Sequence, residues 1–257
     1  MRDAEDPAAQ AQEPEISGRR SWLAAASFVA RVLDVVFPGR CLVCGQELVF
    51  SAQPFWPLCL DCKDIIHPLE GRRCRLCSVV LLSETDLCTR CRQTDYHFFS
   101  NHSLFEYRGV VKELIYQFKF NRRRRVALVF AHFLADAYAV RYSGLPVVPV
   151  PPRSASMRRR GWDHVEQLAL MLKRQHGVAV LRCLKRVGGR PQKSLSFQER
   201  LENIQGRIRL KRTREDLPES VVLLDDLFTT GATADECSRV LSEAGVGRVF
   251  VLTVALD

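Results

Sequence analysis

The stretch from Val221 to Thr233 contains the residue types best suited to chemistry. Its first four residues are apolar and predict a buried strand, which two adjacent carboxylates follow. A turn and the start of a helix come next, with hydroxyl groups and a glycine: Thr229, Thr230, Gly231, Ala232 and Thr233. Backbone N–H groups at a helix start, together with hydroxyl side chains, form a cradle for a phosphate.

The two carboxylates, Asp225 and Asp226, would repel a phosphate, so they require a different role. Placed beside the cradle, they can accept hydrogen bonds from sugar hydroxyls, directly or through Mg2+. A phosphate next to a diol predicts a ribose 5-phosphate site. The alternative is an ordinary strand, turn and helix in which a threonine caps the helix.

Eight of the ten cysteines form four C-x-x-C pairs between residues 41 and 91. The pairs are Cys41/Cys44, Cys59/Cys62, Cys74/Cys77 and Cys88/Cys91. Two such pairs complete a tetrahedral zinc shell, and a closed shell leaves no position for substrate, so we expect structural Zn2+. Disulfides and an iron–sulfur cluster are the alternatives, although paired thiols in a reducing compartment favour zinc. Each ion could be shared by two consecutive pairs, or by two alternate pairs in a cross-braced arrangement.

Basic residues are concentrated in the second part of the chain. Residues 1–100 hold 11 Lys/Arg and 13 Asp/Glu, whereas residues 101–257 hold 27 and 16. Between Arg108 and Arg214 there are 25 basic and 6 acidic residues, more than a nucleotide-sized substrate requires. The run Arg122, Arg123, Arg124 and Arg125 follows aromatic residues, which suits a track for single-stranded nucleic acid. The alternative is a generally basic surface.

The elements that must position these residues alternate between strand and helix. Strands are expected at residues 98–107, 145–150, 178–184, 221–224 and 249–256. Helices are expected at residues 110–120, 126–141, 162–175, 194–205 and 231–244. This order predicts an α/β fold with a parallel sheet, helices on both faces and ligands bound at the carboxyl ends of its strands.

The first 38 residues are expected to lie outside that fold. Residues 1–18 are polar and predict disorder, and residues 19–38 predict an amphipathic helix. Arg19–Arg20 precede an apolar stretch that is too short for a twin-arginine signal and has no cleavage site after it. No run of eighteen apolar residues occurs in the chain, so we expect no membrane span and a cytoplasmic protein.

The acidic pair followed by T-T-G-x-T resembles the phosphoribosyl-pyrophosphate (PRPP) loop of type I phosphoribosyltransferases. Segments at residues 30–45, 105–120, 148–152 and 158–169 resemble ComF family proteins. A further similarity is the spacing of Gln192, Leu195, Arg200, Asn203 and Gly206. The resemblance covers residues 30–257 and implies a double zinc ribbon at residues 39–95, followed by a type I phosphoribosyltransferase domain at residues 96–257.

The resemblance implies PRPP–Mg2+ binding and transfer of phosphoribosyl to an unidentified acceptor, with release of pyrophosphate. Asp225 and Asp226 would be the catalytic residues on ribose and Mg2+, and the residues from Thr229 to Thr233 would hold the 5-phosphate. The pyrophosphate loop would be Arg158, Arg159, Arg160 and Gly161. The next residues, Trp162, Asp163 and His164, replace the family's usual Phe-Asn-Gln.

A second function follows from the same resemblance. ComF relatives are linked to natural competence and to the handling of incoming single-stranded DNA. The alternative is therefore a DNA-uptake factor that acts with competence or helicase machinery and uses its PRPP pocket for regulation. A third, weaker alternative is a zinc-ribbon adaptor with an inactive transferase domain.

Overall fold

The computed structural model describes residues 39–48, 56–83, 86–153, 157–158, 161–188, 204–211 and 216–257. The expected disorder at residues 1–18 and the expected helix at residues 19–38 lie outside these ranges. So do Arg159, Arg160 and most of the helix expected at residues 194–205. No helix in the described ranges is long and apolar enough to cross a membrane.

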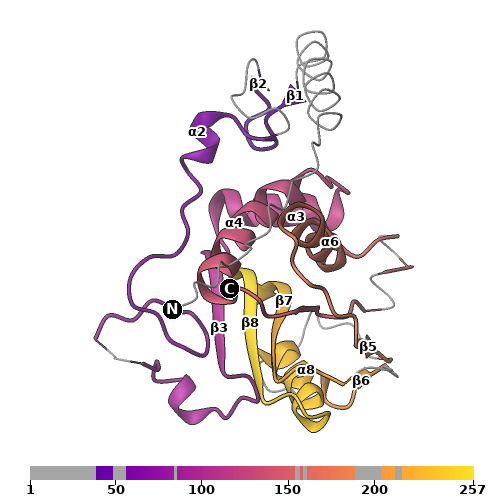
Figure 1. Cartoon of the computed structure of the whole chain (residues 1–257). Helices are drawn as coiled ribbons and strands as arrows, with labels where there is room; N and C mark the ends of the chain where they lie inside the picture. The colour runs from indigo at the N-terminus through magenta and orange to yellow at the C-terminus, as the bar shows by residue number, and fades with distance from the viewer. Residues whose placement is uncertain are drawn as a thin grey trace, which may run out of the picture.

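A four-stranded parallel sheet forms the centre of the molecule (Figure 1). Its strands are β3 (Ser100–Glu106), β8 (Arg248–Leu256), β7 (Ser220–Phe228) and β4 (Val147–Pro149), in that spatial order. Successive side chains of β7 enter different cores: Val222 and Leu224 contribute to one, and Val221 and Leu223 to the other. Both faces of the sheet are therefore buried, as the apolar runs predict.

Helices cover the two faces unequally. On one face lie α3 (Gly109–Phe120), α4 (Val126–Arg141) and α6 (His164–His176), and on the other lies α8 (Ala232–Glu243) (Figure 1). The expected α/β fold is confirmed, and α4 has the predicted bounds. Most of the other elements differ from their predicted bounds by at most two residues at each end.

The strand expected at residues 178–184 is wrong in its bounds. Val180 alone bridges to Val147, and the next strand, β5 (Leu184–Arg186), pairs antiparallel with β6 (Ile208–Leu210) away from the main sheet. The apolar residues there indicated extended chain. They could not indicate its partner, because strand pairing depends on residues distant in sequence.

The strand order creates a switch point between β4 and β7. From β4 the chain passes through α6 to Val180, on one side of β4, and it returns through β7 on the other side. Because the connections before and after β4 run to opposite sides, neither of them covers the carboxyl ends of β4 and β7. Ligands of open parallel sheets bind at such a point, beyond the carboxyl ends of the strands.

Each of the two cysteine segments packs into a different one of the two cores. The first, with β1 (Gly39–Arg40), β2 (Glu47–Leu48) and α2 (Leu60–Lys63), packs beside α3 and α4 (Figure 1). There Gln117 Nε2 donates a hydrogen bond to the Leu42 carbonyl oxygen at 3.1 Å. The second, which ends in the short 3-10 helix η1 (Cys91–Gln93), shares the core beneath α8.

Candidate functional site

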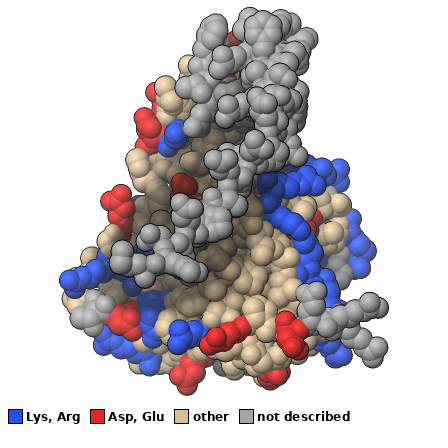
Figure 2. Space-filling view, in the orientation of Figure 1, with Lys and Arg blue, Asp and Glu red and all other residues tan. Residues whose placement is uncertain are grey.

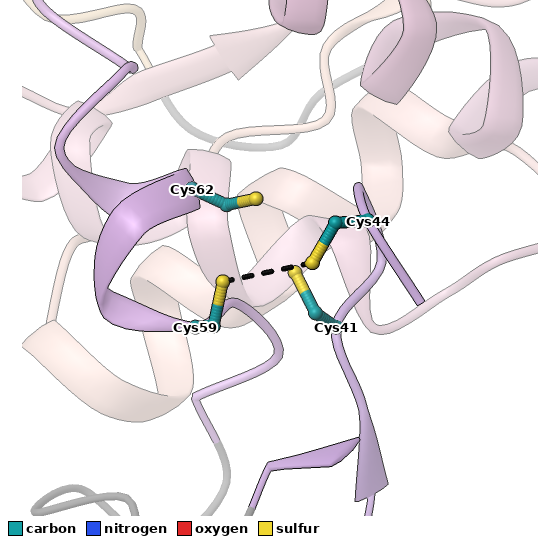
Figure 3. A group of neighbouring side chains, drawn as sticks. All are labelled: Cys41, Cys44, Cys59 and Cys62. Carbon is teal, nitrogen blue, oxygen red and sulfur yellow. Dashed lines mark hydrogen bonds between the residues drawn. The ribbon is translucent and has the colours of Figure 1, made fainter. Parts of the chain in front are cut away.

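The eight paired cysteines form two groups of four thiols. Cys41, Cys44, Cys59 and Cys62 make the first group (Figure 3), and Cys74, Cys77, Cys88 and Cys91 make the second. In each group the Sγ atoms all lie within 4.8 Å of one another. Consecutive pairs therefore share a group, and the cross-braced alternative is wrong.

The spacing of the sulfur atoms fits a tetrahedral zinc ion. The Sγ atoms of Cys44 and Cys59 lie 3.7 Å apart, as do those of Cys77 and Cys88. Zn–S bonds of about 2.3 Å in a tetrahedron place two sulfur atoms about 3.8 Å apart. All ten cysteines are free thiols, and 3.7 Å far exceeds a disulfide bond of about 2.05 Å. These groups are the candidate metal centres.

A cavity of about 340 Å3 opens at the carboxyl ends of β4 and β7. We call it the switch-point pocket. Its walls include every residue that the sequence predicted for the phosphate and ribose: Asp225, Asp226, Thr229, Thr230, Gly231, Ala232 and Thr233. Gly231 has a φ of +78°, which glycine adopts readily, and α8 begins at the next residue. The first turn of α8 therefore borders the pocket.

The acidic pair lies inside β7, and the strand continues beyond the predicted Leu224 to Phe228. Continued pairing with β8 explains the difference, since Asp225 aligns with Thr253 and Phe228 with Leu256. Asp225 Oδ1 accepts a hydrogen bond from the Asp226 N–H at 2.8 Å. The strand thus presents both carboxylates to the pocket from a rigid element.

A lysine and a histidine side chain hold Asp226. Its Oδ2 forms an ion pair with Lys119 Nζ at 2.8 Å and a second one with Nε2 of His164. Burial favours the neutral acid, but Lys119 and His164 outweigh burial and hold the pKa of Asp226 well below its ordinary value. Burial and then the charge of Asp226 raise the pKa of Asp225 above its ordinary value. The pair therefore carries its negative charge mainly on Asp226.

Sequence reasoning did not give Lys119 or His164 a role at the acidic pair. Lys119 is in the last turn of α3, and His164 is the first residue of α6. Both segments belong to stretches that resemble the ComF family, and His164 adjoins the arginine loop. For His164, the neighbouring arginine loop was the one signal in the sequence. A contact with Asp226 could not be predicted, because Lys119 and His164 are both far from Asp226 in the chain.

Among the described arginines, Arg153 and Arg186 line the switch-point pocket; the sequence indicated Arg158, Arg159 and Arg160, of which Arg158 alone lies within the described ranges. Burial and the nearby Arg153 lower the pKa of Arg186 to about 10, and Arg186 Nε has no hydrogen-bond partner among the described residues. Such a crowded, partly buried cationic pair suits an anion. Arg158 is exposed and does not line the pocket, and Gly161 has a φ of +74°.

The three residues that depart from the family pattern have definite positions. Trp162 is buried and packs edge-on against Phe118, with ring centroids 5.1 Å apart. Asp163 caps α6, since its Oδ1 accepts hydrogen bonds from the N–H groups of Val165 and Glu166. With His164 on Asp226, all three stabilise the pocket wall.

The arginine run Arg122–Arg125 lies in the turn between α3 and α4, and all four residues are exposed. Figure 2 shows Lys and Arg side chains gathered on the side of the molecule where α3 and α6 lie. Two half-exposed aromatic rings, Tyr116 and Phe120, precede the run with their centroids 5.0 Å apart. Cations and exposed rings thus occur together outside the pocket.

Comparison with known proteins matches both parts of this structure. A family model described as "Double zinc ribbon domain" matches residues 32–92. Competence protein ComFC of Streptococcus pneumoniae is 26% identical over 80% of this chain and 94% of its own length. DNA utilization protein YhgH of Salmonella typhi is 29% identical, over 83% and 95%. Competence protein F of Haemophilus influenzae is 27% identical, over 85% and 97%.

Over most of its length, including the double zinc ribbon, the chain is therefore similar to ComF-type competence and DNA utilization proteins.

Similarity to solved structures is more limited. Hypoxanthine phosphoribosyltransferases from Staphylococcus aureus and Trypanosoma cruzi align with TM-scores of 0.33 and 0.29, both at 14% identity. Each alignment covers 51% of this chain, and 63% and 65% of the respective structures.

Proposed function

We propose that this protein binds PRPP with Mg2+ in the switch-point pocket and transfers the phosphoribosyl group to an acceptor. The observation that carries the proposal is the convergence of three groups on one cavity. These are the acidic pair of β7, the hydroxyl-rich start of α8, and the arginines 153 and 186. PRPP requires each of them, because it combines a ribose diol, a 5-phosphate and a pyrophosphate.

The acidic pair suits the ribose and its metal ion. Asp225 and Asp226 would accept hydrogen bonds from the two ribose hydroxyls and hold Mg2+, which would neutralise phosphate charge when bound. Lys119 and His164 keep Asp226 ionised and fix its orientation. The acids therefore need little rearrangement to receive the sugar.

The phosphates would occupy separate walls of the pocket. The residues from Thr229 to Thr233 offer hydroxyls and the positive end of the α8 dipole to the 5-phosphate. Arg153 and Arg186 offer charge to the pyrophosphate. In this assignment Arg153 and Arg186 take the place of Arg158, and Arg159 and Arg160 stay predicted ligands outside the described residues.

The reaction requires positioning more than a protein nucleophile. The bond between the anomeric carbon and a pyrophosphate oxygen breaks, and a lone pair of the acceptor forms the new bond to that carbon. Positive charge develops on the ribose ring, so the nearby carboxylates stabilise it, while the arginines stabilise the departing pyrophosphate.

Calorimetry with PRPP and Mg2+ tests the proposal directly. In the variant carrying both Asp225→Asn and Asp226→Asn, we expect the affinity to fall by about 100-fold or more, because the pocket loses the carboxylate charge that would attract Mg2+ and the ribose hydroxyls. Zinc content should remain at the native level. A matched control is Asp136→Asn, an exposed acid on α4, which should bind PRPP as the native protein does. Undiminished affinity in the double variant would refute the site, and release of pyrophosphate across a panel of nucleobases tests the transfer step.

A second candidate function is the handling of single-stranded DNA, with the pocket as a regulatory site. The specific observation is the exposed run Arg122–Arg125 beside the exposed rings of Tyr116 and Phe120. Phosphates would contact the arginines and bases would stack on the rings. The names of the relatives, which refer to competence and DNA utilization, point to the same partner.

The DNA function predicts a steep dependence of affinity on salt. For an oligothymidine probe, replacement of all four arginines of the run by alanine should weaken binding and reduce the slope of log K against log salt by about 3. Lys173→Ala with Arg174→Ala removes exposed charge from α6 and should change the slope much less. Equal slopes in the two variants would contradict the track. A change of DNA affinity on addition of PRPP would identify the regulatory role.

A further inference from the structure

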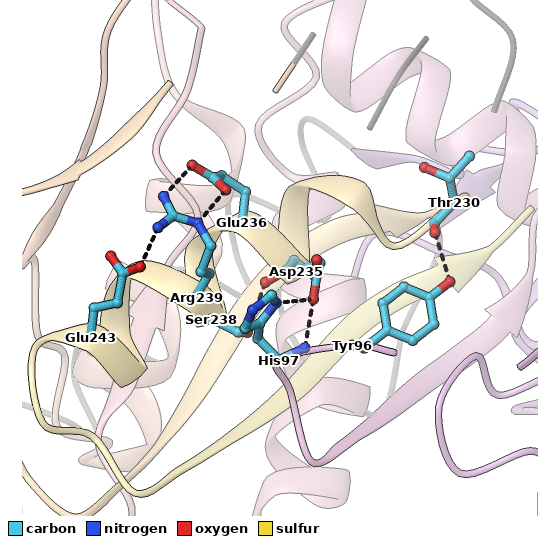
Figure 4. Close-up of polar contacts among 9 residues, drawn as sticks. Tyr96, His97, Thr230, Asp235, Glu236, Ser238, Arg239 and Glu243 are labelled. Carbon is cyan, nitrogen blue, oxygen red and sulfur yellow. Dashed lines mark hydrogen bonds and ion pairs between the residues drawn. The ribbon is translucent and has the colours of Figure 1, made fainter. Parts of the chain in front are cut away.

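The chain that leaves the second cysteine group passes directly beside the start of α8. Cys91 is the last ligand of that group, and Tyr96 follows five residues later. The Tyr96 hydroxyl donates a hydrogen bond to the carbonyl oxygen of Thr230 at 3.0 Å (Figure 4). Because the C=O and N–H of a trans peptide point in opposite directions, this bond also sets the direction of the Gly231 N–H.

A second contact holds the first turn of α8. Asp235 Oδ1 accepts hydrogen bonds from the backbone N–H of His97 at 2.6 Å, and lies 3.0 Å from His97 Nδ1 (Figure 4). Asp235 in turn donates its N–H to the Gly231 carbonyl oxygen at 2.8 Å. Both ends of the Thr230–Asp235 turn are thus hydrogen-bonded to the neighbouring residues Tyr96 and His97. Neither Tyr96 nor Asp235 lines the switch-point pocket.

Aromatic packing surrounds the same turn. A Cβ built on Gly231 would lie 2.9 Å from Cζ of Phe228 and 3.1 Å from Cε1 of Tyr96. Tyr96 stacks on Phe98 with centroids 4.7 Å apart, and Phe98 meets Phe228 edge-on at 6.0 Å. The rings therefore leave no room for a side chain at Gly231, and the hydrogen bonds of Tyr96 and His97 tie the turn to the same segment.

A continuous core connects the second metal group with the turn. Cys74, Cys77 and Cys91 are buried in the same core as Phe98, Phe228 and Ala232. The first metal group belongs to the other core, beside α3 and α4. Only the second group is therefore joined by packing to the start of α8 among the described residues.

We propose that the second zinc ribbon is a positioning element of the phosphate cradle, in which Tyr96 and His97 hold the Thr230–Asp235 turn in its anion-binding shape. Metal in the second group, and not in the first, would then control the affinity for a 5-phosphate. This inference rests on the proposed function for its ligand, although the geometry of the turn can be tested without any ligand.

Tyr96→Phe is the sharpest test, because it removes the hydroxyl and keeps the ring. We expect affinity for PRPP–Mg2+ and for inorganic phosphate to fall about 3- to 10-fold, the effect of one lost hydrogen bond. Amide hydrogen exchange at residues 230–235 should become faster, while zinc content stays at the native level. Asp235→Ala should act in the same direction, and Asp235→Asn, which retains an acceptor oxygen for the His97 N–H, should restore most of the affinity.

Gln117→Ala is the matched control, since it breaks the hydrogen bond between the first ribbon and α3. It should leave exchange at residues 230–235 unchanged and affinity within about twofold of native. Native exchange and native affinity in both Tyr96→Phe and Asp235→Ala would overturn the inference. If the native protein bound neither probe, the proposed function would fail, and the exchange comparison would still decide the role of the ribbon.

Cysteine variants test the metal itself. Cys88→Ser and Cys44→Ser each remove one of the more exposed ligands from the second and the first group, respectively. Each should reduce zinc content, but only Cys88→Ser should accelerate exchange at residues 230–235. The same exchange response in both variants, or a response in neither, would contradict the assignment to the second group.

Discussion

Removal of zinc by a chelator is expected to unfold the cysteine segments of this protein. Between residues 39 and 91 the described chain has only short strands and helices, of four residues at most. Zinc binding stabilises comparable small domains by about 10–16 kcal/mol. Without the metal, the four thiols of each group lose the bonds that hold them together, and the segments rely on packing against the neighbouring core.

We expect the effect of chelation to be confined to the cysteine segments. After chelation, hydrogen exchange should become fast at residues 56–83 and 86–93, while the strands β7 and β8 retain protection. Returning Zn2+ should reverse the change, because the thiols are free. The control is Cys237→Ala, a buried cysteine outside both groups, which should keep its full zinc content. Protected amides at residues 56–83 in the metal-free protein would show that apolar packing alone suffices there.

Replacement of Gly231 by alanine is expected to abolish binding at the phosphate cradle. The residue has a φ of +78°, where a Cβ costs about 1–2 kcal/mol. Its Cβ would also lie 2.9 Å from a Phe228 ring carbon and 3.1 Å from Tyr96, and neither ring can move freely within the core. The turn must therefore change shape, which misdirects the N–H groups at the start of α8.

A second glycine separates backbone strain from the clash. Gly177 has a φ of +67° and ends α6, but nothing lies within 4 Å of a Cβ built there. Gly177→Ala should lower the free energy of unfolding by about 1–2 kcal/mol and keep PRPP affinity. Gly231→Ala should lose PRPP affinity measured by calorimetry and lower the unfolding free energy further. Equal effects of the two variants would contradict the clash.

Much of the fold was predictable because its signals are local. The helix at Val126–Arg141 has a continuous helical sequence with no internal proline or glycine, and its bounds were correct. The four apolar residues at Val221–Leu224 indicated a strand buried on both faces. The end of that strand was not predictable, because Asp225–Phe228 remain extended only through pairing with β8. The strand at residues 178–184 failed for the same reason, since its partner is far away in the chain.

For the candidate zinc ligands, too, one part was predictable from the sequence and another was decided by the fold. Their identity follows from the C-x-x-C spacing, because two thiols on one tight turn can reach a single ion. Which pairs join was open, since neither the charge nor the spacing of the pairs distinguishes consecutive from crossed sharing. The fold decided it by bringing neighbouring pairs within 4.8 Å.

The sequence by itself determined which residues are candidates for a ribose phosphate site, Asp225, Asp226 and Thr229–Thr233, because they follow one another along a strand, a turn and a helix. Tertiary structure alone decided what surrounds them. It brought Lys119 and His164 to Asp226, placed Arg153 and Arg186 on the pocket wall, and set Tyr96 against Thr230 from 134 residues away. Such contacts depend on how strands pair and helices pack, and no local pattern encodes that arrangement.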